Sequence, residues 1–431
     1  MQFLIVFVLI PIAITNIGIS AQLSDQTSNT ESEGFLEFSK AISRFAVDFY
    51  EKCSEERDGN IIVSPFSVAN VLALLIQGAE GKTLKQLQNA LHLQGDKETI
   101  ANYFQEYFRT VRLGAETDEN PSTALSLANR LYLQQGYQVK STFKEVISKK
   151  LNFDIESLNF EDGESCARSI NEFVATKTKN KITEMCKPDS FDATTRLVVV
   201  NAIHFKDDWK KKFDKAATYR DEFFVNATNS VPTEFMTKRD HFKFANLNDL
   251  DASAAEIRYQ NSGLVFVIVL PNSRNGLSSL ESKVTNLELK QITDHFYWRE
   301  GVITIPKFKI ELVLNNLGQI LQKLGMTEIF TSNANLRSLL DPTEPIQLSE
   351  AIHKAIIEVN EDGVEAAAAT GLGMVMSSAV DTVDLPFKAD HPFLYYIMDP
   401  RTNTIIFSGR YVDPSLEAPS GEQKRIKNDE L

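Results

Sequence analysis

Two stretches of this chain are apolar on both of the faces that an extended strand would present. They are TRLVVVNAIHF (195–205) and GLVFVIVLP (263–271). A strand with one face in water alternates polar and apolar residues, so these stretches fit central strands of a sheet that is covered on both sides. The chain is therefore expected to fold around a sheet with other elements packed against each face.

Helical and strand-like segments are unevenly distributed along the sequence. Five residues recur at the spacing of an amphipathic helix: Phe35, Phe38, Ile42, Phe45 and Phe49. Ser64-Pro65 provides the cap and first residue of a second helix, which is apolar all round and therefore buried. Further strand-like runs occupy residues 301–313, 392–399 and 403–412. Helices come first and strands mostly later, without βαβ alternation, so the sequence predicts a single α+β domain.

The N-terminus has the features of a signal peptide. Residues 1–20 read MQFLIVFVLIPIAITNIGIS, a long apolar run that ends in small residues. A membrane anchor is the alternative, but Pro11 interrupts the run and no Lys/Arg cluster flanks it. The sequence predicts cleavage after Ser20, entry into the secretory pathway, no membrane partner, and a polar linker over residues 21–34.

A polar extension, residues 416–431, follows the last predicted strand. Its last four residues, Asn428-Asp429-Glu430-Leu431, resemble the tetrapeptide that retains proteins in the lumen of the endoplasmic reticulum, with Asn in place of the usual Lys or His. Secretion from the cell and retention in that lumen both remain open.

Cysteine usage gives little support for a disulfide framework. Cys53, Cys166 and Cys186 are odd in number and have no CxxC spacing. A Cys166–Cys186 bond and three buried thiols are both open, so the fold must derive its stability from its core. The triplet Asn226-Ala227-Thr228 predicts a glycan on a surface loop at Asn226.

The overall charge argues against nucleic acid as a partner. The formal net charge is −13, whereas phosphate binding needs a concentrated basic surface. Between Lys206 and Lys215 a basic run does occur, but Asp207, Asp208 and Asp214 interleave with its lysines. We interpret this segment as a solvated face and expect neither polyanion binding nor a partner other than protein.

Motifs for catalysis or metal binding were not found in the sequence. The histidines, at 92, 204, 241, 295, 353 and 391, form no HExxH motif and no close pair. There is no GxSxG elbow and no P-loop, and the glycine pattern at Gly371 and Gly373 lacks a third glycine. We therefore predict no catalytic residue, no metal and no cofactor, in a monomeric protein that is not an enzyme.

Residues 354–378, KAIIEVNEDGVEAAAATGLGMVMSS, can be explained in two ways. Local propensity favours a helix that is capped by Asn360 or Asp362, continues through the alanines and stops at Gly371. That explanation leaves the uncharged GLGMVMSS without a role. The alternative is a loop that can become a strand, because small side chains pass easily between packed strands and Gly363 lets the backbone turn. About a dozen new ladder hydrogen bonds at ~1 kcal/mol each would make the inserted state more stable by roughly 10 kcal/mol.

EVNEDGVEAAAAT within this segment resembles the hinge of inhibitory serpins. Further segments resemble the same family: NIIVSPFSV (60–68), NAIHFKDDW (201–209), IPKFKIE (305–311), LGMTEIF (324–330), HPFLYYIMD (391–399) and IIFSGR (405–410). The resemblance covers nearly all of the chain after residue 34. It implies one domain over residues 35–415, with helices packed around mixed and antiparallel sheets and an exposed reactive centre loop at about 361–385.

The resemblance also assigns roles to individual residues. The sheet-opening region is implied to consist of Ser64, Ser67, Asn201, His353 and, at the top of the sheet, Trp209. The hinge is implied to consist of Glu361, Gly363, Val364, Glu365, Ala366, Ala367, Ala368, Ala369 and Thr370. Val364 departs from the Thr or Ser that is usual in the family. Because Val is β-branched and apolar, a side chain that turns inward on insertion should still be accepted.

The family's spacing places the reactive bond at Ser377-Ser378, with Met376-Ser377 as the second choice. No Lys or Arg lies between Lys354 and Lys388, so a protease with a pocket for a basic residue has no bond to attack. The resemblance therefore implies a suicide inhibitor of an elastase-like or chymotrypsin-like serine protease. Inhibition of cysteine proteases and a non-inhibitory role as a lumenal chaperone or carrier are the alternatives.

Overall fold

The computed structural model describes residues 17–110, 125–285, 290–364 and 386–416, with the backbone alone for residues 17–32, Thr110 and Val364. In these ranges the helices are α1 (Ile17–Glu55), α2 (Pro65–Gly78), α3 (Gly81–Ala90), α4 (Lys97–Thr110), α5 (Ser141–Lys150), α6 (Gly163–Lys177), α7 (Leu277–Val284), α8 (Lys290–Thr293) and α9 (Leu317–Lys323). The strands are β1 (Ile61–Val63), β2 (Leu125–Gln134), β3 (Asp154–Leu158), β4 (Leu197–Phe205), β5 (Asp207–Asp208), β6 (Tyr219–Phe224), β7 (Ser230–Leu247), β8 (Ala252–Arg258), β9 (Val265–Pro271), β10 (Tyr297–Pro306), β11 (Phe308–Leu314), β12 (Glu350–Val359), β13 (Gly363–Val364), β14 (Pro386–Lys388), β15 (Phe393–Asp399) and β16 (Thr404–Tyr411).

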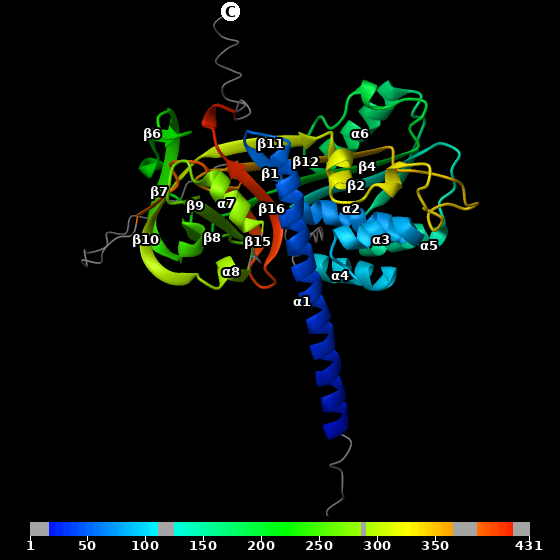
Figure 1. Ribbon diagram of the computed structural model, residues 1–431, viewed down its shortest axis with the longest axis horizontal. Helices are drawn as coiled ribbons and strands as arrows, with labels where there is room; N and C mark the ends of the chain where they lie inside the picture. Colours follow the sequence, from blue (N-terminus) through cyan, green and yellow to red (C-terminus); the bar gives the residue numbers. More distant parts are fainter. Residues whose placement is uncertain (1–16, 111–124, 286–289, 365–385, 417–431) are drawn as a thin grey trace, which may run out of the picture.

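Two sheets organise the described part of the chain. The nine-stranded sheet has the order β1-β16-β15-β9-β8-β7-β10-β14, with β6 paired to β7. The seven-stranded sheet has the order β3-β2-β4-β12-β13-β5, with β11 paired to β12. Figure 1 shows α2 to α5 gathered at one end of the molecule, β6 to β10 at the other, and α1 crossing between them. The fold is α+β, as the order of the predicted elements indicated.

The strand β4 confirms the prediction of a covered central strand, because all nine of its residues are buried. Its side chains alternate between two apolar clusters. Val198, Val200 and Ala202 pack in the smaller cluster, which includes residues of α6. Leu197, Val199 and Ile203 pack in the main core with α2. The seven-stranded sheet is therefore sandwiched at β4 between helices on opposite faces.

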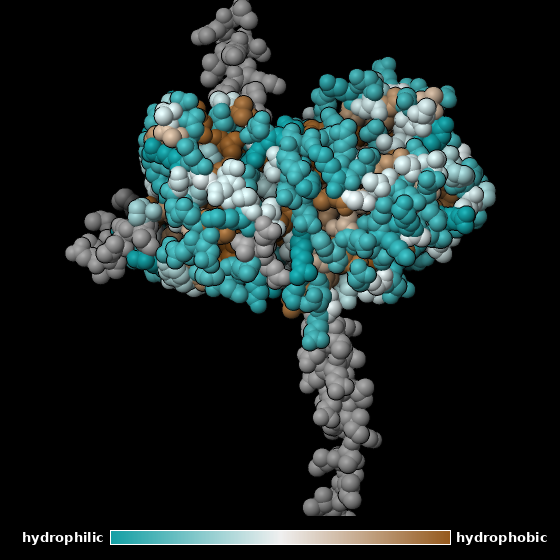
Figure 2. All heavy atoms as spheres, in the orientation of Figure 1, coloured by the Kyte–Doolittle hydropathy of each residue, from teal (hydrophilic) through white to brown (hydrophobic). Residues whose placement is uncertain are grey.

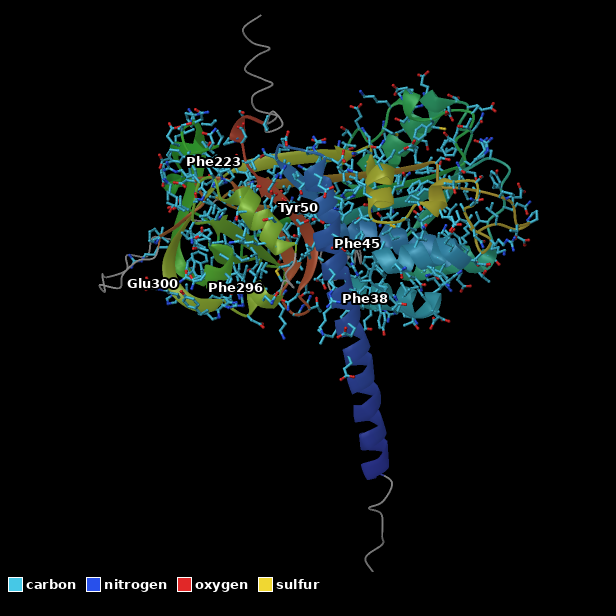
Figure 3. All side chains as sticks on the ribbon, in the orientation of Figure 1. Phe38, Phe45, Tyr50, Phe223, Phe296 and Glu300 are labelled. Carbon is cyan, nitrogen blue, oxygen red and sulfur yellow. The ribbon has the colours of Figure 1, made fainter. Side chains whose placement is uncertain are left out.

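The helix α1 carries the predicted aromatic spacing into the core. Phe38, Ile42, Phe45 and Phe49 are buried, and Figure 3 shows Phe38, Phe45 and Tyr50 at successive levels along the helix. The helix begins at Ile17, so it extends through the segment that was expected to be a polar linker. In α2 the cap prediction is confirmed, since the Ser64 side chain accepts a hydrogen bond from the Ser67 N–H.

The run at 301–313 does not form one continuous strand. The strand β10 ends at Pro306 in the nine-stranded sheet, and β11 begins at Phe308 in the seven-stranded sheet. Lys307 lies between them and donates its N–H to the Glu234 carbonyl. An apolar pattern alone does not mark this change, because both strands continue the alternation.

Other sequence predictions can be placed in the fold. Cys53, Cys166 and Cys186 are free and buried, so the structure favours buried thiols over a disulfide. Asn226 is exposed in the turn between β6 and β7.

None of the helices in the described ranges combines the length and apolar character needed to span a membrane. Figure 2 shows the face that carries α1 as largely hydrophilic, with apolar atoms visible only in small patches.

Candidate functional site

The candidate functional site is the turn at residues 360–362 of the seven-stranded sheet, which connects the end of β12 to β13. The strands β4 and β12 are parallel neighbours, in register from Glu350 opposite Val198 to Ile356 opposite His204. After β12 the chain turns, and β13 runs antiparallel to β12 on one side and to β5 on the other. Because β5 follows β4 along the chain, β13 is positioned as the first piece of a strand between β4 and β12.

The turn before β13 is bound tightly to the segment that follows β5. The Trp209 indole N–H donates to the Asn360 carbonyl at 2.8 Å, and its backbone N–H donates to the Asp362 carbonyl at 2.9 Å. Within the turn, the Asn360 side chain accepts from the N–H groups of Asp362 and Gly363. The hinge as far as Val364 is therefore extended and does not begin a helix, while the alanines of the predicted helix lie outside the described residues.

Only glycine fits at position 363. Its φ angle is +151°, and an added Cβ would lie 2.2 Å from the Asp207 carbonyl oxygen. Real Cβ atoms do not approach backbone oxygen so closely, and L-residues rarely adopt this φ. Gly363 therefore allows β13 to approach β5.

Two carboxylates of the hinge are held by basic side chains of other elements. Glu361 accepts a hydrogen bond from the Thr218 hydroxyl at 2.7 Å and lies 3.2 Å from the Lys307 ammonium. Asp362 lies 2.7 Å from Lys215 and 3.3 Å from Lys212. Burial would raise the pKa of both carboxyls, but Thr218 at Glu361 and Lys215 at Asp362, with the neighbouring lysines, hold each pKa below its ordinary value. Both carboxylates are therefore charged, and their contacts with Lys307, Lys215 and Lys212 fix the turn before β13 in place.

Four of the predicted residues meet in a buried polar cluster below the hinge. The His353 ring accepts from the Ser64 N–H at 3.1 Å and donates through Nδ1 to the Asn201 side-chain oxygen at 2.6 Å. The Asn201 amide donates to the Ser67 hydroxyl and to Asn129. Trp209, the fifth predicted residue, lies apart from this cluster, against the hinge turn.

The polar cluster crosses the line along which a new strand would enter. Asn129 is opposite Asn201 in the β2–β4 ladder, and Asn201 is opposite His353 in the β4–β12 ladder. Separating β4 from β12 would break the Asn201–His353 hydrogen bond. The cluster therefore stabilises the pairing of β4 with β12.

His353 makes the stability of the closed sheet depend on pH. Burial lowers its pKa from 6.5 to about 3, so below pH 6.5 the unfolded chain takes up a proton that the folded chain does not. The neutral His353 side chain therefore makes its full contribution to the free energy of unfolding above pH 6.5. That contribution falls by about 1.4 kcal/mol per pH unit as the pH is lowered toward 3. We expect the free energy of unfolding, measured with urea, to fall between pH 6 and pH 4 by about 2.5 kcal/mol less in His353→Gln than in the wild type.

The matched control for that experiment is His241→Gln, at an exposed histidine. The control should keep the acid slope of the wild type. An unchanged slope in His353→Gln would show that His353 is not the buried neutral group described here.

Three residues at the site were not predicted from the sequence, and only the last of them, Lys354, had a signal there. Asn129 lies within a strand of ordinary apolar pattern, and Lys307 lies between two strands that the sequence does not separate. Lys354 is 4% exposed on β12, where its ammonium bonds the Glu184 carbonyl at 2.7 Å and the Glu311 carboxylate at 2.5 Å. Lys354 thus ties β12 to the segment that follows α6. A buried lysine in an apolar strand is a usable signal, because it requires a partner of opposite charge or a carbonyl.

The remaining predicted residues lie outside the described part of the chain. They are Glu365, Ala366, Ala367, Ala368, Ala369 and Thr370 of the hinge, and Met376, Ser377 and Ser378 at the reactive bond. Over the described ranges, no group of three or more His, Cys, Asp or Glu side chains is arranged to hold a metal ion.

The fold and the hinge together define a class of protein. In this class the chain turns back after a central strand, here β12, and begins a new strand of the same sheet, here β13. Comparison with protein-family models identifies that class. The model Serpin (serine protease inhibitor) matches residues 40–414. The chain belongs to the serpin family, whose members are mostly protease inhibitors.

Individual relatives agree with this assignment over most of their length. Serine protease inhibitor 42Dd of Drosophila melanogaster is 35% identical over 382 residues, which are 88% of this chain and 98% of that protein. The leukocyte elastase inhibitor of Xenopus laevis is 32% identical over 382 residues, covering 87% of this chain and 99% of that protein.

Solved structures of the same fold are also similar. Cleaved Serpin 42Da superposes with a TM-score of 0.78 at 32% identity, covering 88% of this chain and 99% of that one. Uncleaved ovalbumin gives a TM-score of 0.76 at 25% identity, covering 88% of this chain and 100% of that one.

Proposed function

We propose that this protein inhibits a serine protease by acting as a suicide substrate. One observation carries the proposal: Gly363 and Val364 already pair with β12 and with β5, in the position of a strand that would separate β12 from β4. A strand that continues from Val364 would be antiparallel to both neighbours. The part of the reactive loop that follows Val364 therefore has a place to insert.

The proposed reaction starts with ordinary proteolysis. The serine hydroxyl of the protease attacks the Ser377 carbonyl carbon, an ester bond forms, the Ser377–Ser378 peptide bond breaks, and the new amine of Ser378 takes a proton. Insertion of the loop then carries the acylated enzyme away from the hinge and distorts it before water hydrolyses the ester. The inhibitor contributes no catalytic residue, so it is not an enzyme.

The free energy for this movement comes from exchanging ladders in the seven-stranded sheet. Insertion breaks the parallel ladder that runs from Glu350–Val198 to Ile356–His204. In return the new strand forms an antiparallel ladder on each side. At ~1 kcal/mol net per hydrogen bond, with apolar burial in addition, the inserted state is favoured by about 10 kcal/mol.

The loop sequence selects the target. A bond at Ser377-Ser378 suits a small specificity pocket of the elastase type, and a bond at Met376-Ser377 also suits a chymotrypsin-like pocket. Relatives named leukocyte elastase inhibitor support this class of target. Trypsin-like enzymes are disfavoured because Lys354 and Lys388 are the nearest basic residues on either side of the loop.

We further propose that the protein enters the secretory pathway and acts as a glycosylated monomer. The signal peptide predicted at residues 1–20 and the exposure of Asn226 between β6 and β7 support this proposal. The tail Asn428–Leu431 leaves retention in the endoplasmic reticulum and release from the cell as its two destinations.

The proposal is tested by incubating the mature protein with pancreatic elastase and with chymotrypsin, followed by denaturing gels. We expect a complex that survives denaturation, together with a released C-terminal peptide whose mass shows that it begins at Ser378 or Ser377. Cleavage of the loop without a complex would overturn the inhibitor and favour a non-inhibitory chaperone or carrier. A complex with papain, but with neither serine protease, would move the target to cysteine proteases.

A further inference from the structure

Trp298 is the most exposed aromatic side chain in the described part of the protein. It is 55% exposed at the beginning of β10, where it lies opposite Lys243 of β7. Figure 3 shows Phe296 and Glu300, which lie on either side of Trp298 in sequence, near the outer margin of the nine-stranded sheet. Beside Trp298 is a depression of about 200 Å³ with walls from β7, β8, β10 and the segment after β5. An exposed indole at a depression is typical of a residue that becomes buried in a partner.

The indole is held in place by cations that are themselves fixed. The Arg258 guanidinium lies 4.8 Å from the ring centroid, and the Lys243 ammonium lies 5.9 Å from it. Each cation is also 3.3 Å from the Glu256 carboxylate, whose side chain is 4% exposed. The surface is therefore ordered before any partner arrives, which reduces the entropy lost on binding.

The charges around the depression favour a protein partner over a polyanion. Lys211 pairs with Asp240 at 2.7 Å, in addition to the two pairs with Glu256. Asp240 and Glu256 stand among three of these cations, whereas a polyanion site concentrates cations without neighbouring carboxylates. An exposed aromatic surrounded by mixed charges matches the anatomy of a protein interface.

The depression lies next to both attachment points of the reactive loop. On the hinge side, Trp209 donates to the Asp362 carbonyl, and the next residue, Lys210, donates its N–H to the Arg258 carbonyl. On the far side, the chain leaves the loop at Pro386, which pairs with Val302 of β10. Trp298 is four residues before Val302 on the same strand, a distance of about 13 Å. A protein bound to the loop is therefore brought close to Trp298.

We propose that Trp298, supported by Arg258, is a secondary docking site for the protease that attacks the loop. This proposal rests on the inhibitory function proposed above. Ser377 is nine residues before Pro386, so the attacked carbonyl stays within about 32 Å of the β10–β14 ladder. The matching surface on the protease, outside its active site, is an apolar recess rimmed by carboxylates, which accepts the indole and pairs with Arg258 and Lys210. The site adds affinity and selectivity that a loop with small residues alone does not supply.

The test uses the mature full-length protein and whichever of elastase and chymotrypsin it inhibits faster. Trp298→Ala is expected to lower the second-order rate constant of inhibition about tenfold, and Trp298→Phe should restore part of it. A second measurement titrates each variant with the same protease carrying Ala in place of its catalytic serine, so that affinity is measured without chemistry. The dissociation constant should rise about tenfold for Trp298→Ala.

The matched control is Tyr297→Ala. Tyr297 is 41% exposed and adjacent in sequence, but on a strand its side chain points to the opposite face. The control should stay within about twofold of the wild type in both measurements. Equal effects of the two variants, or no effect of Trp298→Ala, would overturn the docking site while leaving the inhibitor intact.

Two further outcomes are also decisive. Acceleration of the wild type by a sulfated polysaccharide, lost in Trp298→Ala, would make this face a polyanion site and overturn a protease-docking role. Failure of the wild type to form a complex with either protease would overturn the proposed inhibition, and the docking site with it.

Discussion

Val364→Arg is expected to turn the protein from an inhibitor into a substrate of its target protease. Val364 already pairs with β12 and with β5, and it must stay in the sheet when the residues after it enter between β4 and β12, where the neighbouring strands are buried. A guanidinium forced into that position would be desolvated without a partner, at a cost of several kcal/mol. Insertion should then be slower than hydrolysis of the acyl-enzyme. On denaturing gels the covalent complex should fall to less than about a tenth of its wild-type amount, while cleaved inhibitor accumulates.

The matched control places the same residue one position further along the chain. In an inserted strand successive side chains alternate, so Glu365→Arg should point to the outer face and keep most of the inhibition. The account would be contradicted if Val364→Arg still formed the complex at the wild-type yield, because insertion beyond Gly363 would then not be required.

Glu361→Lys is expected to loosen the top of the seven-stranded sheet. The change removes the acceptor of the Thr218 hydroxyl and places an ammonium group opposite Lys307, at a side chain that is 7% exposed. Breaking a buried ion pair and adding a like charge should cost about 3 kcal/mol, discounted for the partial exposure of Lys307. The expected results are an unfolding temperature lower by about 4 °C and ready self-association on mild heating, measured by calorimetry and size-exclusion chromatography.

The control for charge reversal is Glu358→Lys, near the end of β12. Glu358 faces Lys309 at 3.7 Å, with both side chains about a third exposed, so the change should cost less than about 1 kcal/mol. If both variants lost the same stability, the Glu361–Lys307 contact would have no special role at the hinge.

Much of the scaffold could be predicted because its signals are local. The strand β4 was recognisable from its unbroken apolar character, and α2 from its Ser-Pro start. Glycine at 363 was recognisable as a hinge residue, although its reason, the approach to the Asp207 carbonyl, required the structure.

The arrangement of the hinge could not be predicted from local signals. Helix propensity over the alanines competes with strand pairing, and the outcome at Gly363 and Val364 depends on β5, more than 150 residues earlier in the chain. The partners of the carboxylates, Lys307 for Glu361 and Lys215 for Asp362, are likewise distant in sequence. Long-range pairing of this kind leaves no periodicity to detect.

The measurement that tests the central claim most directly is the unfolding temperature before and after a single cut in the reactive loop. The cut is made with a protease that is not trapped, and the two fragments are kept together. If the loop becomes a strand between β4 and β12, the cleaved form gains about 10 kcal/mol and should unfold about 12 °C higher than the intact form. An unfolding temperature that stays the same, or falls, would contradict insertion and with it the proposed mechanism of inhibition.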